Sequence, residues 1–418
     1  MLDAYRLLSS AGSDESDRLH AAGLERYLFQ QDGSIDLFER ALVVDPEFGA
    51  ASLGLALALR AEGRIPDANR TIKSTRSMRL NDREQSLYFA VLQLSGAKFD
   101  DADAHLAEHL RGWPSDALAL QLRLFLLNLF SSRPDRDQEM LRCVRSTEAA
   151  FDGHPFFLSA LAFALEEARE FEVAHDVAQE ALRLLPNNAR AAHACAHTFL
   201  ETGAFEKGES FLDDWINDWV HPGVFTCHAR WHQGLSALAR ADYSVVASRL
   251  DEVLAFVGRS AAVLVDGASL AWRLVLDERD DGIQEATSAL LNVANPPGVR
   301  FLNAHHAMVL AIGGDISRLK SYRNELAALG AENMATAEWA NGLALFVSGN
   351  YGEAADVFET LAPRFRVLGG SQAQTDVFRE TLIRALQRSG RRNEARSMLT
   401  ARLDQRHSKR DDDWLATL

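Results

Sequence analysis

One local pattern recurs along the chain and limits the folds that the chain can adopt. A short polar or glycine-containing turn is followed by a large apolar residue, and a small residue follows three positions later. The clear copies start 34, 72, 34 and 146 residues apart, and these steps fit one, two, one and four units of about 34 residues. The clear copies are Ile65/Ala68, Phe99/Ala102, Phe171/Ala174, Phe205/Gly208 and Tyr351/Ala354, and weaker ones are Tyr243/Val246 and Ile316/Leu319.

The segments between these copies have the apolar period of amphipathic helices, as in EAREFEVAHDVAQEALRLLP. In a hairpin of two helices, the large residue would cover the turn and the small one would let the second helix approach the first. A helical hairpin repeated every 34 residues is typical of tetratricopeptide repeats. We therefore predict an all-α fold of about ten tetratricopeptide-like hairpins, stacked as one right-handed α-solenoid over residues 1–418. Residues 1–150 hold the looser repeats, and residues 151–400 carry the candidate site.

Charge and cysteine content exclude several function classes. The formal net charge is −15, from 44 basic and 59 acidic residues, so the chain lacks the basic surface that nucleic acids and anionic membranes require. Three cysteines without CxxC spacing indicate no disulfide framework. No apolar run is long enough to span a membrane, and the first residues do not resemble a secretory signal. We expect a cytoplasmic protein.

Four of the 13 histidines form two pairs with a spacing of four: His193 and His197 in HACAHTFLETG, and His228 and His232 in CHARWHQGL. Each pair precedes a copy of the turn pattern, which places it on the first helix of a hairpin. First helices line the concave wall of such an array, and a spacing of four puts both imidazoles on one face. Two imidazoles on one face can bind one metal ion, so we predict that these four histidines are ligands of a zinc-like divalent transition metal.

The neighbouring first helices add polar residues inside apolar runs. LVDGASLAWRL contributes Asp266 and Arg273, FLNAHHAMVL contributes His305 and His306, and FFLSALAFALEE ends in Glu166 and Glu167. Buried charges are costly unless they are paired or bound to a metal, so a shared site is predicted. We assign catalytic roles to Glu167, Asp266 and Arg273, and ligand-binding roles to Trp231, His306, Gln374 and Asp376.

A structural interpretation stands beside the site. Histidines in helical cores are often buried with one ring nitrogen bonded to a carbonyl group, and Cys195 points away from the face of His193 and His197. The charged tail DQRHSKRDDDW is expected to be a solvated end. The chain has no glycine-rich phosphate loop, GxSxG or CxxC motif, so nucleotide binding, serine hydrolysis and thiol redox chemistry have no local support.

Four segments resemble the tetratricopeptide repeat protein 38 family: HACAHTFLETGAFEKGESFLDDW, CHARWHQGLSALARADY, LVDGASLAWRL and LGGSQAQTDVF. The resemblance covers residues 40–400 and is most specific between 193 and 380. It implies an all-helical repeat fold without assigning a reaction. The family usually has a basic residue where Thr375 stands, and a histidine where this chain has Leu87 or Tyr88. The family's pattern is matched at His193, His197, His228, His232, Asp266, Arg273, His306, Gln374, Asp376 and Glu167.

Two functions remain open from the sequence. In the first, a concave pocket binds a small molecule or a metal ion and supports acid–base or metal-assisted hydrolytic chemistry. In the second, the chain is a non-catalytic scaffold that binds a peptide or protein in its groove, and its acidic balance favours a basic partner. The sequence leaves open whether the protein is an enzyme.

Overall fold

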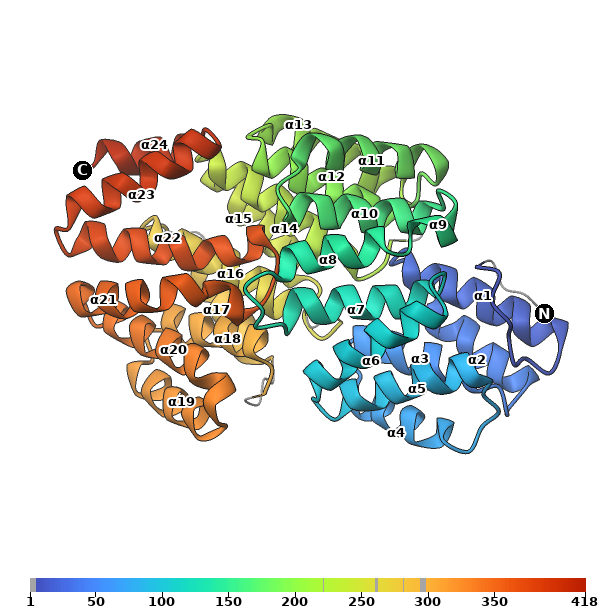
Figure 1. Cartoon of the computed structure of the whole chain (residues 1–418). Helices are drawn as coiled ribbons and strands as arrows, with labels where there is room; N and C mark the ends of the chain where they lie inside the picture. Colours follow the sequence, from blue (N-terminus) through green and yellow to red (C-terminus); the bar gives the residue numbers. More distant parts are fainter. Residues whose placement is uncertain (1–4, 221, 260–261, 281, 294–297) are drawn as a thin grey trace. The chain divides into compact units, whose positions relative to one another are not determined.

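The computed structural model describes residues 5–220, 222–259, 262–280, 282–293 and 298–418. Over these residues it contains 24 α-helices, two short 3-10 helices and no β-strand (Figure 1). The predicted all-α class is therefore confirmed, as a tetratricopeptide-like helical repeat fold. None of the described helices combines the length and apolar character of a membrane-spanning segment.

Contacts divide the chain into two compact units, and each is described by itself. The first unit holds residues 1–195 and 215–225, and the second holds residues 196–214 and 226–418. The first unit contains α1 (Asp14–Leu28), α2 (Ser34–Val44), α3 (Gly49–Ala61), α4 (Ile65–Thr75), α5 (Asp82–Ser95), α6 (Phe99–Gly112), α7 (Ala117–Leu129), α8 (Arg136–Arg145), α9 (Glu148–Phe151), α10 (Pro155–Glu167), α11 (Phe171–Leu184) and the first part of α12 (Ala189–Glu201).

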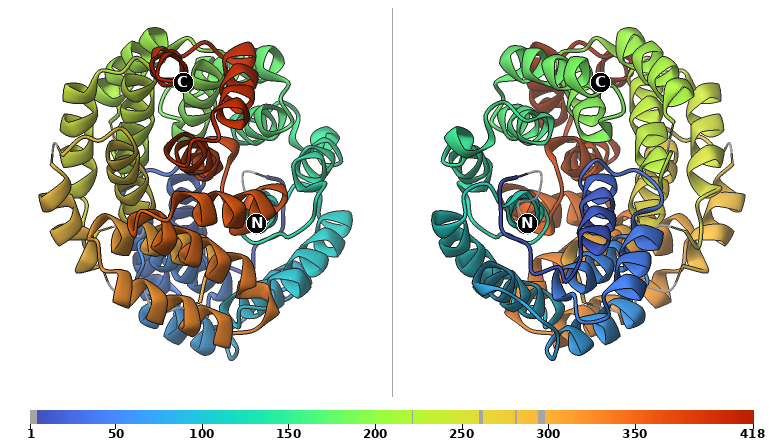
Figure 2. Two further views of the ribbon diagram at one scale, coloured as in Figure 1. Left: turned by 90° about the vertical axis from the view of Figure 1, so that its left-hand side faces the viewer. Right: turned by 90° about the vertical axis from the view of Figure 1, so that its right-hand side faces the viewer.

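The second unit continues α12 and carries the remaining helices. Figure 2 shows its yellow-to-orange helices lying side by side in chain order. The helices of the second unit after α12 are α13 (Phe205–Asp218, whose last residues belong to the first unit), α14 (Phe225–Ala239), α15 (Tyr243–Leu254), α16 (Ala262–Leu276), α17 (Ile283–Leu291), α18 (Arg300–Ile312), α19 (Ile316–Ala328), α20 (Met334–Val347), α21 (Tyr351–Leu361), α22 (Gln372–Arg388), α23 (Arg392–Gln405) and α24 (Lys409–Ala416).

The repeated turn pattern marks the start of the second helix in each hairpin. All seven large apolar residues are the first residues of helices, namely of α4, α6, α11, α13, α15, α19 and α21. The seven small or apolar residues three positions later are all buried. At Gly208 the approach is so close that an added Cβ would lie 2.8 Å from Phe199 Cβ. The predicted hairpin unit is therefore confirmed, because this spacing brings the two helices into contact.

The turns of these hairpins share one backbone geometry. The residue two positions before each second helix has a positive φ, and at Ala97 this angle is 57°. The next amide then bonds to a carbonyl near the end of the first helix, as Lys98 N does to Gln93 O at 3.0 Å. Glycine adopts this left-handed conformation without strain, but three of the seven turns use Ala97, Arg169 and Ala241 instead.

In the second unit, α22 packs on a helix from much earlier in the chain. The first helices α16, α18 and α20 pack on one another in order, and α22 contacts α16 as well as α21. Trp272 of α16 donates its indole N–H to the hydroxyl of Thr381 at 2.9 Å, across 109 residues of sequence. The core of this unit is built on buried aromatic rings that include Trp231, Trp272, Trp339 and Phe378.

The expectation that the charged tail, residues 404–414, is a solvated end is wrong. It forms α24, whose Arg410 and Asp411 are 2% and 1% exposed. Ser408 begins this helix as its N-cap and also donates its hydroxyl to Ala239 O at 3.2 Å. The segment is therefore an integral part of the second unit.

We predict that replacing Ala97 by glycine stabilises the protein by about 0.5–1 kcal/mol. Left-handed backbone costs a non-glycine residue about 1–2 kcal/mol, and the extra chain entropy of glycine offsets about half of that. Ala97 is exposed, so no packing is lost. Urea unfolding measures the change. The matched control is Gly349→Ala, at a turn with φ of 79° and open space for a Cβ, which should destabilise the protein. Equal stability of both variants and the parent would contradict the prediction.

Candidate functional site

Three histidines converge within the second unit. His197 comes from α12, and His228 and His232 come from one face of α14. The ring centroids of His197 and His232 are 4.6 Å apart, and those of His228 and His232 are 4.8 Å apart. Each of the three offers a ring nitrogen within 4.8 Å of the others, and His197 and His232 are almost fully buried. The structure thus brings together three of the four predicted ligands in one place.

Asp266 of α16 orients one of these imidazoles. Its carboxylate oxygens lie 3.0 and 3.1 Å from His228 Nδ1. A carboxylate only accepts hydrogen bonds, so Nδ1 carries the proton and Nε2 keeps its lone pair for a ligand. Asp266 itself is fully buried. This is the arrangement in which a carboxylate supports a metal-binding histidine from behind.

Trp231 forms one wall of this histidine cluster. Its ring stacks on His228, with centroids 4.9 Å apart and an angle of 14° between the planes, and it meets His232 edge-on at 4.8 Å. Its indole N–H points to Ser269 Oγ at 3.3 Å. Trp231 therefore packs beside the histidines, and its ligand-binding role stays a prediction.

His193 and Glu167 belong to the first unit. His193 lies one turn before His197 on α12 and is partly exposed. Its ring stacks on Phe163 at 5.6 Å and meets Phe225 at 5.3 Å. Glu166 and Glu167 are buried at the end of α10.

The other predicted residues are placed apart from the histidine cluster by their partners. Gln374 accepts a hydrogen bond from Ser371 N at 3.0 Å in the capping box of α22. His306 packs edge-on against Tyr322 at 5.0 Å. His305 donates from Nδ1 to Phe301 O at 2.8 Å, and burial lowers its pKa to about 4. These three residues fit the structural interpretation.

Cys195 also behaves as a core residue. It is fully buried, and burial raises the pKa of its thiol to about 12. Its sulfur lies 3.5 Å from Gln179 Nε2, on the side of α11. The expectation that Cys195 points away from the face of the histidines is consistent with this contact.

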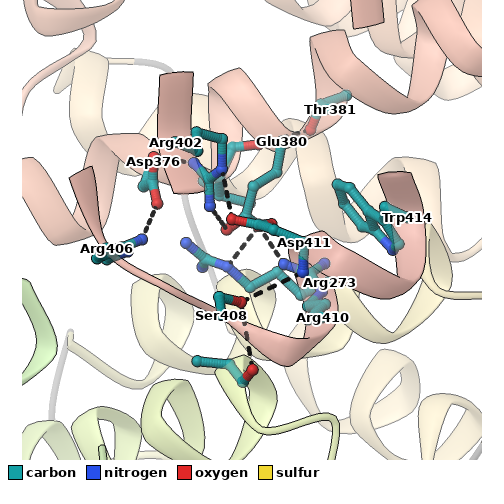
Figure 3. A network of polar contacts seen from close by, with 12 residues as sticks. Arg273, Asp376, Glu380, Thr381, Arg402, Arg406, Ser408, Arg410, Asp411 and Trp414 are labelled. Carbon is teal, nitrogen blue, oxygen red and sulfur yellow. Dashed lines mark hydrogen bonds and ion pairs between the residues drawn. The ribbon is translucent and has the colours of Figure 1, made fainter. Parts of the chain in front are cut away.

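Arg273 and Asp376 belong to a second polar group, which we call the arginine cluster (Figure 3). Arg273 donates from Nε to Glu380 at 2.8 Å, so it neutralises a carboxylate of this chain. Asp376 accepts from Arg402 at 2.6 Å and also from Arg406. The cluster comprises Arg273, Arg402, Arg406, Arg410, Glu201, Asp277, Asp376, Glu380 and Asp411.

The arginine cluster is absent from the sequence-based predictions, because the charged tail was expected to be solvated. A signal was present, since Arg402, Arg406, Arg410 and Trp414 follow one another at intervals of four residues. Arg410 binds Asp277 at 2.7 Å, and the indole N–H of Trp414 donates to the same carboxylate at 2.8 Å. Regular spacing in a charged tail therefore indicated a bound segment.

One face of α16 connects the two groups. Asp266 contacts the histidine cluster, Ser269 contacts both Trp231 and Arg273, and Asp277 follows Arg273 by one turn. These positions are three or four residues apart, so they lie on one stripe of the helix. The stripe forms a continuous polar path between the histidine cluster and the arginine cluster.

Arginines lower the pKa of two carboxylates of this cluster, whereas burial raises the pKa of Asp277 in spite of Arg410. Burial would raise the pKa of Glu380, but the guanidinium groups of Arg273 and Arg410 outweigh burial and lower it. The same competition holds the pKa of Asp376 well below its usual value, through Arg402 and Arg406. The ion pairs of Glu380 and Asp376 therefore persist over the neutral pH range.

No family model matches the sequence. Among solved structures, the chain is similar to yeast Tom70 (13% identity, 96% of this chain and 87% of that chain, TM-score 0.41). It is also similar to a tetratricopeptide repeat protein from Parabacteroides merdae (14% identity, 73% and 98%, TM-score 0.38). A third similar structure is a monomeric mutant of IFIT1 with Gppp-AAAA (12% identity, 98% and 95%, TM-score 0.43).

We predict that acid weakens the protein through Asp376. The pKa of Asp376 is lower in the folded protein than in the unfolded chain, where it is about 3.9. The contribution of this carboxylate to the free energy of unfolding is therefore complete above about pH 3.9 and is lost as the pH falls below that value. In urea unfolding, stability should decrease steeply from pH 5 to pH 3. Asp376→Asn should make this decrease smaller by about 1 kcal/mol, since a lowered carboxylate pKa costs about 1.4 kcal/mol for each pH unit below about 3.9. The exposed Asp404→Asn is the control, and the prediction fails if both variants keep the slope of the parent.

Proposed function

We propose that the second unit of this tetratricopeptide-like protein binds a zinc-like divalent transition metal through His197, His228 and His232. The observation that carries the proposal is the convergence of three ring nitrogens within 4.8 Å, with Asp266 oriented behind one of them. Imidazole nitrogens bind zinc at about 2.0–2.1 Å, so two ligands of one ion lie about 3.4 Å apart. Small rotations of the three rings would close the remaining distance.

The type and surroundings of these side chains favour a metal ion over an anionic or hydrophobic ligand. Three neutral imidazoles offer nitrogen lone pairs, which suit zinc, copper or nickel better than magnesium or calcium. Two of them, His197 and His232, are buried, where a bound metal ion would be shielded from water. The stacked ring of Trp231 limits the motion of His228 and so prepares it for binding.

His193 and Glu167 lie in the first unit, and their roles as a metal ligand and a catalytic carboxylate stay predictions. Arg273 is engaged with Glu380, so we do not propose the catalytic role for it. We accordingly propose metal binding, and hydrolysis would need a substrate-binding group that the histidine cluster does not contain among the described residues.

The resemblance to the tetratricopeptide repeat protein 38 family supports the same assignment, and we propose that the chain is a member. The matched residues include all four paired histidines and Asp266. The two departures lie elsewhere. Leu87 is a buried residue of α5, and Thr375 bonds its hydroxyl to Ser371 O at 3.1 Å inside α22.

A second candidate function is a scaffold for a basic protein segment. The observation that favours it is the set of buried carboxylates on α12, α16 and α22, which arginines already neutralise. Small-molecule binding in the same groove has no comparable support from a described contact.

We predict that His197→Ala and His232→Ala each weaken zinc binding at least tenfold, because each removes a direct ligand. Isothermal titration of the full chain with zinc, together with elemental analysis of the purified protein, measures the effect. Cys195→Ala is the matched control on α12 and should bind zinc as the parent does. If the parent binds no metal, and both histidine variants lose about 1–3 kcal/mol of stability, the histidines are core residues and the proposal fails.

We predict that Asp266→Asn lowers zinc affinity by about tenfold. The amide no longer holds the Nδ1 proton of His228 as firmly, and loss of such a support typically costs 10–100-fold in affinity. The same titration measures it, with the exposed Asp404→Asn as the control. Unchanged affinity in Asp266→Asn would show that the carboxylate only fills space.

A further inference from the structure

The inner surface around the arginine cluster is acidic once the C-terminal segment is left aside. Glu201 of α12, and Asp376 and Glu380 of α22, are buried there, as is the side chain of Asp277, which directly follows α16. Arg273 is the one arginine of the cluster that comes from these three helices, and it pairs with Glu380 at 2.8 Å. Arg379 and Arg384 of α22 also favour the charged forms of Asp376 and Asp277, so these four carboxylates outnumber the three arginines of the same elements that act on them. We call this the acidic surface.

Residues 402–414, here called the C-terminal segment, supply the other positive charges. Arg402 contacts Asp376 at 2.6 Å and Glu380 at 3.4 Å. Arg406 binds Glu201 at 3.0 Å as well as Asp376. The segment therefore places one arginine over each pair of carboxylates, at intervals of four residues.

The next two positions of the same spacing complete the contact. Arg410 binds Asp277 at 2.7 Å and Glu380 at 3.1 Å. Trp414 donates to Asp277 and packs its ring under the guanidinium of Arg410, 4.2 Å from its centroid. Figure 3 shows Arg402, Arg406 and Arg410 gathered around Asp376, Glu380 and Asp411. The residues of the C-terminal segment that contact the acidic surface thus have the spacing Arg-x3-Arg-x3-Arg-x3-Trp.

The segment is held by its arginines and by Trp414, which packs in the hydrophobic core of the second unit, and the polar fit of the arginine contacts is incomplete. Buried ion pairs contribute little net stability, because the desolvation of both charges offsets their attraction. Arg410 Nη2 and Asp411 Oδ1 are buried and make no hydrogen bond with the described residues. Both residues line a cavity in which the space open to the centre of a water molecule is about 20 Å³, enough for about one water. A segment bound in this way is open to competition.

We propose that the acidic surface is a docking site for an arginine-rich segment of a partner protein, in which arginines and a tryptophan recur every four residues. The C-terminal segment is the resident competitor and occupies the surface until the partner replaces it. Removing the arginines without a replacement would leave uncompensated buried carboxylates, so only a basic segment can take their place. The net charge of −15 favours the approach of such a partner. This inference deepens the scaffold alternative and is independent of the metal.

The test uses the full chain and a fluorescein-labelled synthetic peptide of residues 401–418 as the probe. Binding is measured by fluorescence anisotropy in the parent and in Arg410→Ala, which weakens the resident segment. We expect at least tenfold tighter binding to Arg410→Ala, because the competitor is released more often. Adding Asp277→Asn to that variant should remove the gain, since it deletes the carboxylate that binds both Arg410 and Trp414.

Controls separate recognition from non-specific attraction. A peptide of the same composition with scrambled order should not bind, and equal binding of both peptides would overturn the proposal. So would an Arg410→Ala protein that is folded by circular dichroism and does not bind the probe. If Arg410→Ala does not fold, Arg406→Ala serves in its place, since Arg402 still neutralises Asp376 there.

Two further measurements assign the occupant. A parent dimer that Arg410→Ala converts to a monomer would assign the surface to a second copy of this chain and would overturn the proposal. The probe should bind Arg410→Ala equally with and without His232→Ala. That result would hold whether or not the histidine cluster binds metal, so the two proposals fail separately.

Discussion

The buried ion pair between Arg273 and Glu380 determines how the second unit is arranged. It joins α16 to α22 across 107 residues of sequence, and both side chains are almost fully removed from solvent. Loss of either partner would leave an isolated charge, at a cost of about 3–5 kcal/mol, so the two helices cannot separate cheaply. Glu380 also binds Arg402 and Arg410, which brings the C-terminal segment to the same point. The position of that segment therefore follows from one pair of charges.

The polar stripe of α16 connects the ion pair of Arg273 and Glu380 to the histidine cluster. Ser269 contacts both Trp231 and Arg273, and Asp266 on the same face holds His228. A helix turn is rigid over this distance, so a shift of α16 would move both groups together. The histidine cluster and the arginine cluster are thus both built on α16, although each has its own polar partners.

Much of the fold could be predicted because it is encoded locally. The large and small residues of the turn pattern act within a single hairpin, and all seven copies start a helix where expected. The convergence of His197, His228 and His232 was also predictable, because a spacing of four and adjacent first helices suffice to infer it. The arginine cluster could not be predicted in this way, since Arg410 binds Asp277 across 133 residues of sequence and Arg406 binds Glu201 across 205. No local pattern of a charged tail reveals partners at such distances, and Arg273 was assigned a catalytic role for the same reason.

The contact between α16 and α22 also has an evolutionary consequence. Open helical arrays gain or lose whole hairpins by duplication or deletion, since each hairpin contacts only its neighbours. Here the hairpins between α16 and α22 form a closed path, because Trp272 and Arg273 at one end must meet Thr381 and Glu380 at the other. Deleting or inserting one hairpin would move Glu380 away from Arg273 and leave both buried charges without their ion-pair partner. The repeat number in this part of the chain is therefore set by the ion pair, and sequence change there is restricted to substitutions within a constant count of hairpins.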